Sequence, residues 1–198
     1  MGHREDLLAG AKRCLYERGY GRTTARDIVA ASGTNLGSIG YHFGSKDALL
    51  TAAIIDSFAE WGAELDAVMG SLTTAADADS EADWFERFEH ACTLLIESFD
   101  GHRALWVSAV EAFAQAEHIP EVRRQLSASL EETREGLVEV LERFASHVSS
   151  RTARTSASLL IALLPGLALQ WLLDPERAPT GEELGHALRE LLHGPSGP

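Results

Sequence analysis

The sequence predicts an all-α fold, and two observations carry this prediction. Apolar residues recur every three or four positions through most of the 198 residues, which is the spacing of one helix face. No segment alternates β-branched and polar residues in the way that a half-buried strand would. The composition, 45% hydrophobic and 24% charged, is that of a globular chain that can bury a sizeable core. We therefore expect helices throughout.

Three short helices are expected in the first part of the chain. Residues Glu5 to Gly19 place apolar side chains at helical spacing and end in a glycine. Thr24 can cap a second helix, because Asp27 follows three residues later and completes a capping box. Gly33 ends that helix, and a third is expected from Asn35 to Phe43.

The rest of the chain is expected to form longer helices. Ser45 is an N-cap for a helix to about Met69, and residues 71–80 are typical of a loop. Pro165 should kink the apolar helix in which it lies, and the interrupted run of 17 apolar residues there favours a core or interface helix over a membrane span. The expected later helices are Trp84–Phe99, Arg103–Glu117, Pro120–His147, Thr152–Leu173 and Glu182–Leu192.

The charge distribution divides the chain into two parts. A formal net charge of -13 argues at first against nucleic acid, whose phosphates repel an acidic surface. Residues 1–50, however, hold seven Lys or Arg against five acids, a net of +2, whereas the other 148 residues hold ten against 25, a net of -15. This asymmetry predicts two domains with different partners, residues 1–50 and residues 51–198.

Cofactor and catalytic sites are not expected. Cys14 and Cys92 cannot alone form a disulfide framework or a four-ligand zinc site, and Cys14 lies on the apolar stripe of the first helix. The histidines have no paired ligand spacing, and neither a catalytic triad nor a phosphate-binding glycine loop can be identified. The absence of an N-terminal signal pattern predicts a cytoplasmic protein. We also expect no cofactor, no metal and no membrane partner.

The two short helices that meet at Gly33 have the features of a helix-turn-helix. That motif needs a small residue in the turn, an apolar anchor for the second helix, and short polar side chains toward the DNA groove. Gly33 supplies the turn, and Ile39 and Phe43 supply the anchor. Asn35 and Ser38 lie one turn apart and can hydrogen-bond base edges or phosphates.

Three further residues, near the end of this helix and after it, can hold the DNA backbone. Tyr41 and His42 can donate to phosphate oxygens, and Lys46 lies in the first turn of the next helix, where the helix dipole also attracts an anion. Taken singly, Tyr41 could simply pack and Lys46 could simply be a solvated side chain. Their shared spacing behind a helix-turn-helix favours DNA contact.

These segments together resemble a known family. The stretches Thr23 to Ile28, Gly33 to Phe43 and Ser45 to Leu50 are similar to the N-terminal DNA-binding domain of TetR-type transcriptional regulators, over nearly all of residues 4–54. The resemblance implies an all-α homodimer with a three-helix DNA-binding domain and a C-terminal helical bundle for effector binding and dimerisation. The residues that it assigns to DNA are Thr24, Asn35, Leu36, Gly37, Ser38, Tyr41, His42 and Lys46.

Two positions depart from the family pattern. Leu36 stands where many members have a basic residue, and Gly40 stands where many have tyrosine. Leu36 could contact a thymine methyl group instead, so base preference cannot be transferred from other members. Gly40 lowers helix propensity by about 1 kcal/mol and removes a phosphate donor.

The C-terminal part is expected to hold an unknown small, largely hydrophobic effector. Its aromatic side chains fall at core-facing positions, for which simple packing is the alternative explanation. The family resemblance and the polar groups within apolar stretches favour a pocket between helices. The expected pocket residues are Trp61, Phe88, Cys92, Trp106, Phe113 and Gln170.

The last two helices are expected to form a homodimer. The helix from Thr152 to Leu173 is apolar on every side, so a core on one face and a partner subunit on the other would bury it. Residues 166–175 also resemble, more weakly, the penultimate helix of many family members. The expected interface residues are Leu160, Leu163, Leu164, Leu167, Ala168, Leu188 and Leu191.

The sequence therefore predicts a dimeric transcriptional repressor that an effector releases from double-stranded operator DNA. The alternative from another class is a helical ligand-binding or interaction module with little DNA binding. An enzyme built in the helical bundle is disfavoured, because no catalytic set of residues can be identified.

Overall fold

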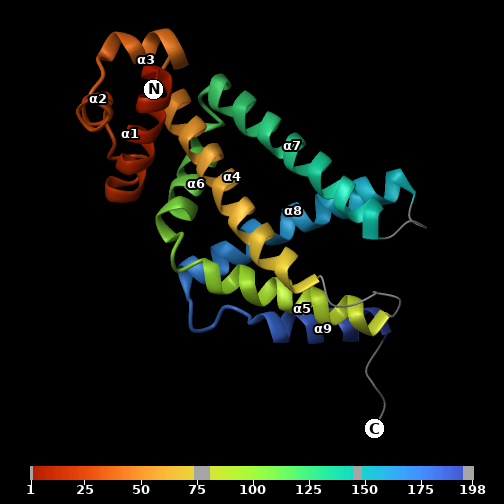
Figure 1. Cartoon of the computed structure of the whole chain (residues 1–198). Helices are drawn as coiled ribbons and strands as arrows, with labels where there is room; N and C mark the ends of the chain where they lie inside the picture. Colours follow the sequence, from red (N-terminus) through yellow and green to blue (C-terminus); the bar gives the residue numbers. More distant parts are fainter. Residues whose placement is uncertain (1, 74–80, 145–148, 194–198) are drawn as a thin grey trace. The chain divides into compact units, whose positions relative to one another are not determined.

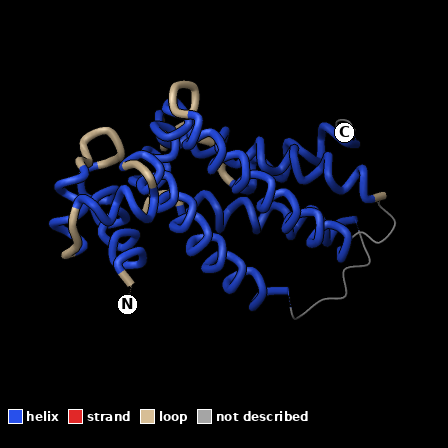
Figure 2. The backbone as a smooth tube through the Cα atoms, turned by 90° about the horizontal axis from the view of Figure 1, so that it is seen from above, coloured by secondary structure: helices blue, strands red, loops and turns tan. Residues whose placement is uncertain are grey.

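The all-α prediction is confirmed. The computed structural model describes residues 2–73, 81–144 and 149–193, and these ranges contain nine helices and no strand (Figure 1). Short loops join most of the helices (Figure 2). The helices are α1 (His3–Arg18), α2 (Ala25–Ser32), α3 (Leu36–Phe43), α4 (Lys46–Thr73), α5 (Glu81–Ser98), α6 (Arg103–Gln115), α7 (Pro120–Phe144), α8 (Ser150–Leu173) and α9 (Gly181–His193).

Most predicted helix ends agree with these bounds to within a few residues. The helix α4 runs to Thr73, past the start of the loop that was expected from residue 71. Gly70 does not stop it, because one glycine inside a helix costs only about 1 kcal/mol. Residues 74–80 of that expected loop, and residues 145–147 of the helix expected to end at His147, lie outside the described residues. The helix α8 continues through Pro165.

The chain forms two compact units. The first contains residues 1–59 and 104–165, and the second contains residues 60–103 and 166–198. The first unit thus holds α1, α2 and α3, which we call the head, with the start of α4, the helices α6 and α7, and most of α8. The second holds the remainder of α4 and α8 together with α5 and α9.

One core runs through the first unit from the head into α6. The side chains that α1 points inward are buried completely or nearly so, as the helical spacing predicted, and Cys14 is among them. Because α6 contributes to the same core, the head does not fold around apolar residues of its own alone. Core members are Leu7, Ala11, Cys14 and Leu15 of α1, Ile28 of α2, Ile39 of α3, Leu49, Leu50 and Ile54 of α4, and Leu105, Ala109 and Ala112 of α6.

The predicted capping box begins α2. The amide of Asp27 donates to Thr24 Oγ1 at 3.2 Å, and the amide and hydroxyl of Thr24 donate to Asp27 Oδ2 at 2.9 and 2.7 Å. These bonds from the Thr24 hydroxyl and amide lower the pKa of the Asp27 carboxyl from its usual value. The start of α2 is therefore fixed by two residues three positions apart.

Further caps fix the end of α2 and the starts of α3 and α4. Gly33 has a φ of 68°, a left-handed conformation that glycine adopts without steric penalty, and it separates α2 from α3. Asn35 is the N-cap of α3, because its Oδ1 accepts the amide of Ser38 at 3.1 Å. Ser45 caps α4 as predicted, its Oγ accepting the amide of Ala48 at 3.0 Å.

In the second unit, α5 and α9 pack closely through glycines on α9. A Cβ atom on Gly181 would collide with the backbone of Thr93, and one on Gly185 would lie 2.9 Å from Glu89 Cβ. These glycines are four residues apart and so lie on one face of α9. The close contact leaves one face of α9 covered by α5.

Candidate DNA interface and ligand cavity

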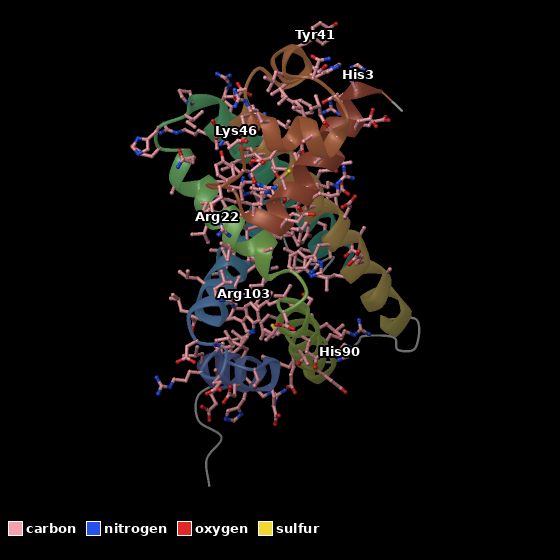
Figure 3. All side chains as sticks on the ribbon, turned by 90° about the vertical axis from the view of Figure 1, so that its left-hand side faces the viewer. His3, Arg22, Tyr41, Lys46, His90 and Arg103 are labelled. Carbon is pink, nitrogen blue, oxygen red and sulfur yellow. The ribbon has the colours of Figure 1, made fainter. Side chains whose placement is uncertain are left out.

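The outer surface of α3 is exposed. Tyr41 is 86% exposed and points away from the head (Figure 3), and its ring meets that of His42 edge to face with centroids 4.8 Å apart. Asn35, Leu36 and Gly37, at the start of α3, are also exposed. A short helix with an exposed N-terminal turn, anchored by a buried Ile39, can enter a DNA groove.

Ser38 was predicted to face the DNA groove, but the structure buries it. It is only 8% exposed, and its Oγ lies 3.4 Å from Nδ1 of His3 on α1. Its position on the inner face of α3 follows from helix geometry, because Ser38 and the buried Ile39 adjoin on that face. Ser38 is therefore the predicted residue least able to reach DNA.

Lys46 is half-buried at the start of α4 and has several partners. Its Nζ donates to the carbonyl oxygen of Thr23 at 3.3 Å and lies 3.3 Å from Asp47 Oδ1. The ammonium is also 5.7 Å from the centroid of the Tyr20 ring. These contacts give the ammonium a defined position next to the head. Thr24 is exposed, although its hydroxyl is used in the capping box.

A polar contact that the sequence did not reveal ties α6 to the head. The amide of Gly21, in the turn between α1 and α2, donates to Glu111 Oε2 at 2.7 Å. Beside it, the hydroxyl of the buried Tyr20 donates to Asp47 Oδ1 at 3.2 Å. Burial raises the pKa of Tyr20, so this residue remains a hydrogen-bond donor. Gly21 and Glu111 are 90 positions apart, and no local pattern predicts their contact.

A cavity of about 190 Å³ lies in the second unit. The indole of Trp61 forms one wall, and its Nε1 donates to Ser98 Oγ at 3.1 Å. Nδ1 of His102 is 3.0 Å from the carbonyl oxygen of Ser98, and its Nε2 is 3.9 Å from Glu64 Oε2. The cavity thus combines an aromatic surface, an imidazole and a carboxylate. Its lining residues are Trp61, Glu64, Leu65, Leu94, Ser98 and His102.

The six predicted effector residues are not brought together in one place. Of these, Trp61 alone lines the cavity, and Phe88 and Cys92 lie in the same unit on α5. Burial raises the pKa of the Cys92 thiol to about 11. Trp106 belongs to the first unit and packs edge to face on Phe58, with ring centroids 4.9 Å apart.

The two remaining effector residues are exposed. Phe113 lies on the exposed side of α6. Gln170 lies in the second unit, and its side-chain amide donates to the carbonyl oxygen of Gly166 at 3.3 Å along α8. Helical spacing alone therefore does not assign these six residues to one cavity.

The predicted dimer residues differ in their exposure. Leu163 is 44% exposed and Leu191 is 83% exposed, whereas Ala168 is 1% exposed and so is covered by its own chain. Leu160, Leu164, Leu167 and Leu188 are partly buried. Four more leucines of these helices are exposed: Leu159, Leu169, Leu173 and Leu192.

Comparisons with known proteins agree with this architecture. The family model for bacterial regulatory proteins of the TetR family matches residues 7–53, and the model for the C-terminal part of BetI-type transcriptional repressors matches residues 84–194. The transcriptional repressor AcnR of Corynebacterium efficiens is 43% identical over 52 residues, which are 26% of this chain and 28% of AcnR. The chain thus matches little more than a quarter of that relative.

Two other proteins are similar over most of their length. The transcriptional regulator TtgR of Pseudomonas putida is 25% identical over 188 residues, covering 87% of this chain and 81% of TtgR. The crystal structure of the multidrug binding protein EbrR complexed with imidazole has a TM-score of 0.67 at 26% identity and covers 96% of this chain and 95% of EbrR. Because the C-terminal family model alone matches more than half of the residues and the N-terminal model matches the head, the chain belongs to the TetR family of transcriptional regulators.

Proposed function

We propose that this chain is a cytoplasmic repressor that binds double-stranded operator DNA as a homodimer and leaves it when a small, largely hydrophobic effector binds. The observation that carries the proposal is the exposed surface of α3, which begins in a capped turn and carries the strongly exposed Tyr41. In this proposal, residues 1–50 bind DNA, and residues 51–198 bind the effector and the partner subunit.

The DNA-binding residues have two roles in this proposal. Asn35, Leu36 and Gly37 enter the major groove, where exposed side chains can contact base edges. Thr24, Tyr41, His42 and Lys46 contact phosphates, which sets the position of the head without selecting a sequence. Because each cationic contact to a phosphate releases counterions from the DNA, binding should weaken as salt is added.

The exposed leucines of α8 and α9 support a homodimer. Only 11% of the most apolar stretch of α8 is buried within the chain. By length and composition α8 could also cross a membrane, but its charged first turns and membership of a DNA-binding family favour a protein partner. A second copy of the same face would cover these leucines around a twofold axis. The proposed interface contains Leu163 and Leu191, with Leu159, Leu173 and Leu192.

The cavity beside Trp61 supports effector binding in the second unit. Its volume of about 190 Å³ is below the usual range for drug-sized ligands and suits a small molecule. The indole supplies apolar contact, and Glu64 and His102 supply polar groups that can orient a ligand. EbrR is a multidrug binding protein, which supports ligand binding by this chain as well.

The experiment that tests DNA binding begins with a selection from genomic fragments of about 30 base pairs, long enough for two half-sites one helical turn apart. Lys46→Ala should weaken binding to all sequences and lower the salt slope by about one, because it removes one phosphate contact. Leu36→Ala should instead change the preferred sequence.

The matched control is Arg177→Ala, which removes the same charge from an exposed residue of the second unit. If the wild-type chain retained no fragment in the presence of competitor DNA, the alternative of a ligand-binding module would replace the proposal. If Lys46→Ala and Leu36→Ala both bound as the wild type does at matched salt, the assignment of α3 and Lys46 would be wrong.

A further inference from the structure

The turn between α1 and α2 is held by one carboxylate of α6. Glu111 Oε2 accepts the Gly21 amide at 2.7 Å, a short hydrogen bond to a charged acceptor. Both residues belong to the first unit, so this contact lies within one compact body. A methyl group on Gly21 would lie 3.6 Å from the same oxygen, which is ordinary van der Waals contact. The bond therefore depends on the carboxylate and the amide rather than on the absence of a side chain.

Tyr20, the residue before Gly21, links the turn to Lys46 through Asp47. Tyr20 is buried, and its hydroxyl donates to Asp47 Oδ1 at 3.2 Å. The same Asp47 oxygen lies 3.3 Å from Lys46 Nζ, which also donates to the Thr23 carbonyl at 3.3 Å. Thr23 is in turn fixed by its own hydroxyl, which donates to the Gly19 carbonyl at 2.7 Å. One group that holds the Lys46 ammonium, the Thr23 carbonyl, thus belongs to the α1–α2 turn, and the other, the Asp47 carboxylate, accepts a hydrogen bond from Tyr20 of that turn.

A positioned ammonium binds phosphate better than a free one. A lysine side chain has four rotatable bonds, and immobilising it on binding costs side-chain entropy. In this head part of that entropy is already lost, because the ammonium is held by Asp47 and Thr23 and lies over the Tyr20 ring. If the turn were looser, the Lys46 side chain would be free to move, and it would lose that entropy when it binds phosphate.

We propose that Glu111 is a positioning residue for operator binding: by fixing the Gly21 turn, it keeps Tyr20, Asp47 and Thr23 in the places that hold the Lys46 ammonium. This inference rests on the proposed function, in which Lys46 contacts phosphate. Glu111 itself acts through Lys46 and touches no DNA in this proposal.

Three substitutions at Glu111 test the hydrogen bond separately from the charge. On the fragment that the wild-type chain selects, Glu111→Ala should weaken binding about tenfold, because the Gly21 amide loses its acceptor. Glu111→Asp keeps the charge but shortens the side chain by one methylene, so a several-fold loss is expected there too. Glu111→Gln keeps an acceptor oxygen at the same reach and should stay within about twofold of the wild type.

The control is Glu139→Ala on α7, an exposed residue of the same unit that loses the same charge. Removing a negative charge should, if anything, strengthen binding to DNA. A loss for Glu111→Ala with none for Glu139→Ala therefore cannot be a general charge effect. The Gly21 amide should also exchange with solvent faster in Glu111→Ala and Glu111→Asp, and at the wild-type rate in Glu139→Ala.

A double-mutant cycle shows whether Glu111 acts through Lys46. The double variant Glu111→Ala with Lys46→Ala should bind within about twofold of Lys46→Ala alone, because the ammonium that Glu111 positions is already absent. Additive losses, or a Glu111→Ala and a Glu111→Asp that bind as the wild type does, would overturn the inference and leave the proposed function intact. Failure of the wild-type chain to select any fragment would instead refute the proposed function, and this inference with it.

Discussion

The head and the α8 and α9 helices are both rich in apolar residues, yet they place them differently. Leu7 and Ile28 of the head are completely buried, whereas Leu173 of α8 is 78% exposed and Leu191 of α9 is 83% exposed. A buried leucine or isoleucine contributes about 1.5 to 3 kcal/mol to the free energy of folding, and an exposed one contributes little. Apolar periodicity therefore predicts that a face will be covered, but it does not say by what.

This difference has an energetic meaning. The stability of the head comes from burial within one chain, so it should not depend on protein concentration. The leucines of α8 and α9 gain their burial energy only when another molecule covers them, so that contribution should rise with concentration. Substitutions in the head and in α8 test this contrast.

The largest effect is expected from arginine on α8. Ala168→Arg places a charge where only 1% of the residue is exposed, and we expect a loss of about 3 to 5 kcal/mol and an unfolded second unit. Leu163→Arg, at a half-exposed position, should leave the chain folded but raise the dimer dissociation constant at least about a hundredfold. Thermal unfolding and sedimentation velocity distinguish the two outcomes. Leu130→Arg, an exposed leucine of α7, is the control. A wild-type-like dimer for Leu163→Arg would remove α8 from the interface.

The next effect concerns the core of the head. Ile28→Ala should lower the free energy of unfolding by about 2 to 5 kcal/mol, because it leaves a cavity in a fully buried site. Val140→Ala, at an exposed site of α7, should change it by less than about 0.5 kcal/mol. Urea unfolding followed by circular dichroism measures both. Equal losses would show that burial in this structure does not separate the two positions.

A smaller effect is expected at the cap of α2. Thr24→Ala removes the hydroxyl of the capping box and should cost about 1 kcal/mol at neutral pH. The pKa of Asp27 is lowered in the folded chain, so its contribution is present above the usual aspartate pKa and is lost as the pH falls through the lowered value. The gap in melting temperature between wild type and Thr24→Ala should therefore narrow below about pH 4. A gap independent of pH would contradict this assignment.

The smallest expected effect is a gain. Gly40 lies inside α3 with a helical backbone, and an added Cβ would meet nothing within 4 Å. Gly40→Ala should raise the free energy of unfolding by about 0.5 to 1 kcal/mol. Gly33→Ala should act in the opposite direction, because its φ of 68° disfavours any side chain. If Gly40→Ala and Gly33→Ala changed the free energy of unfolding in the same direction, backbone conformation would not explain their effects.

The sequence predicted the contacts whose two partners lie close together along the chain, and it did not predict those whose partners lie far apart. The Thr24 and Ser45 caps were predicted because donor and acceptor lie three residues apart. The Gly21 to Glu111 bond was not, because 90 residues separate its partners.

The sequence also does not show which apolar residues are buried within the chain. Ala168 and Leu163 have the same signal in sequence, and only the packed structure separates the buried alanine from the exposed leucine. The predicted effector residues lie in two different units for the same reason. Aromatic residues at helical spacing can equally well pack in a core or line a cavity.

The cap of α3 limits what the first turn of this helix can recognise. The Ser38 amide uses one lone pair of the Asn35 side-chain oxygen, so the orientation of this side chain is set by the cap. The NH₂ group remains available to acceptor atoms of a base, and the oxygen keeps a second lone pair. An asparagine reads adenine in the major groove by using its oxygen and its nitrogen together. Adenine at this position of the operator would therefore have to share the Asn35 oxygen with the helix that it caps.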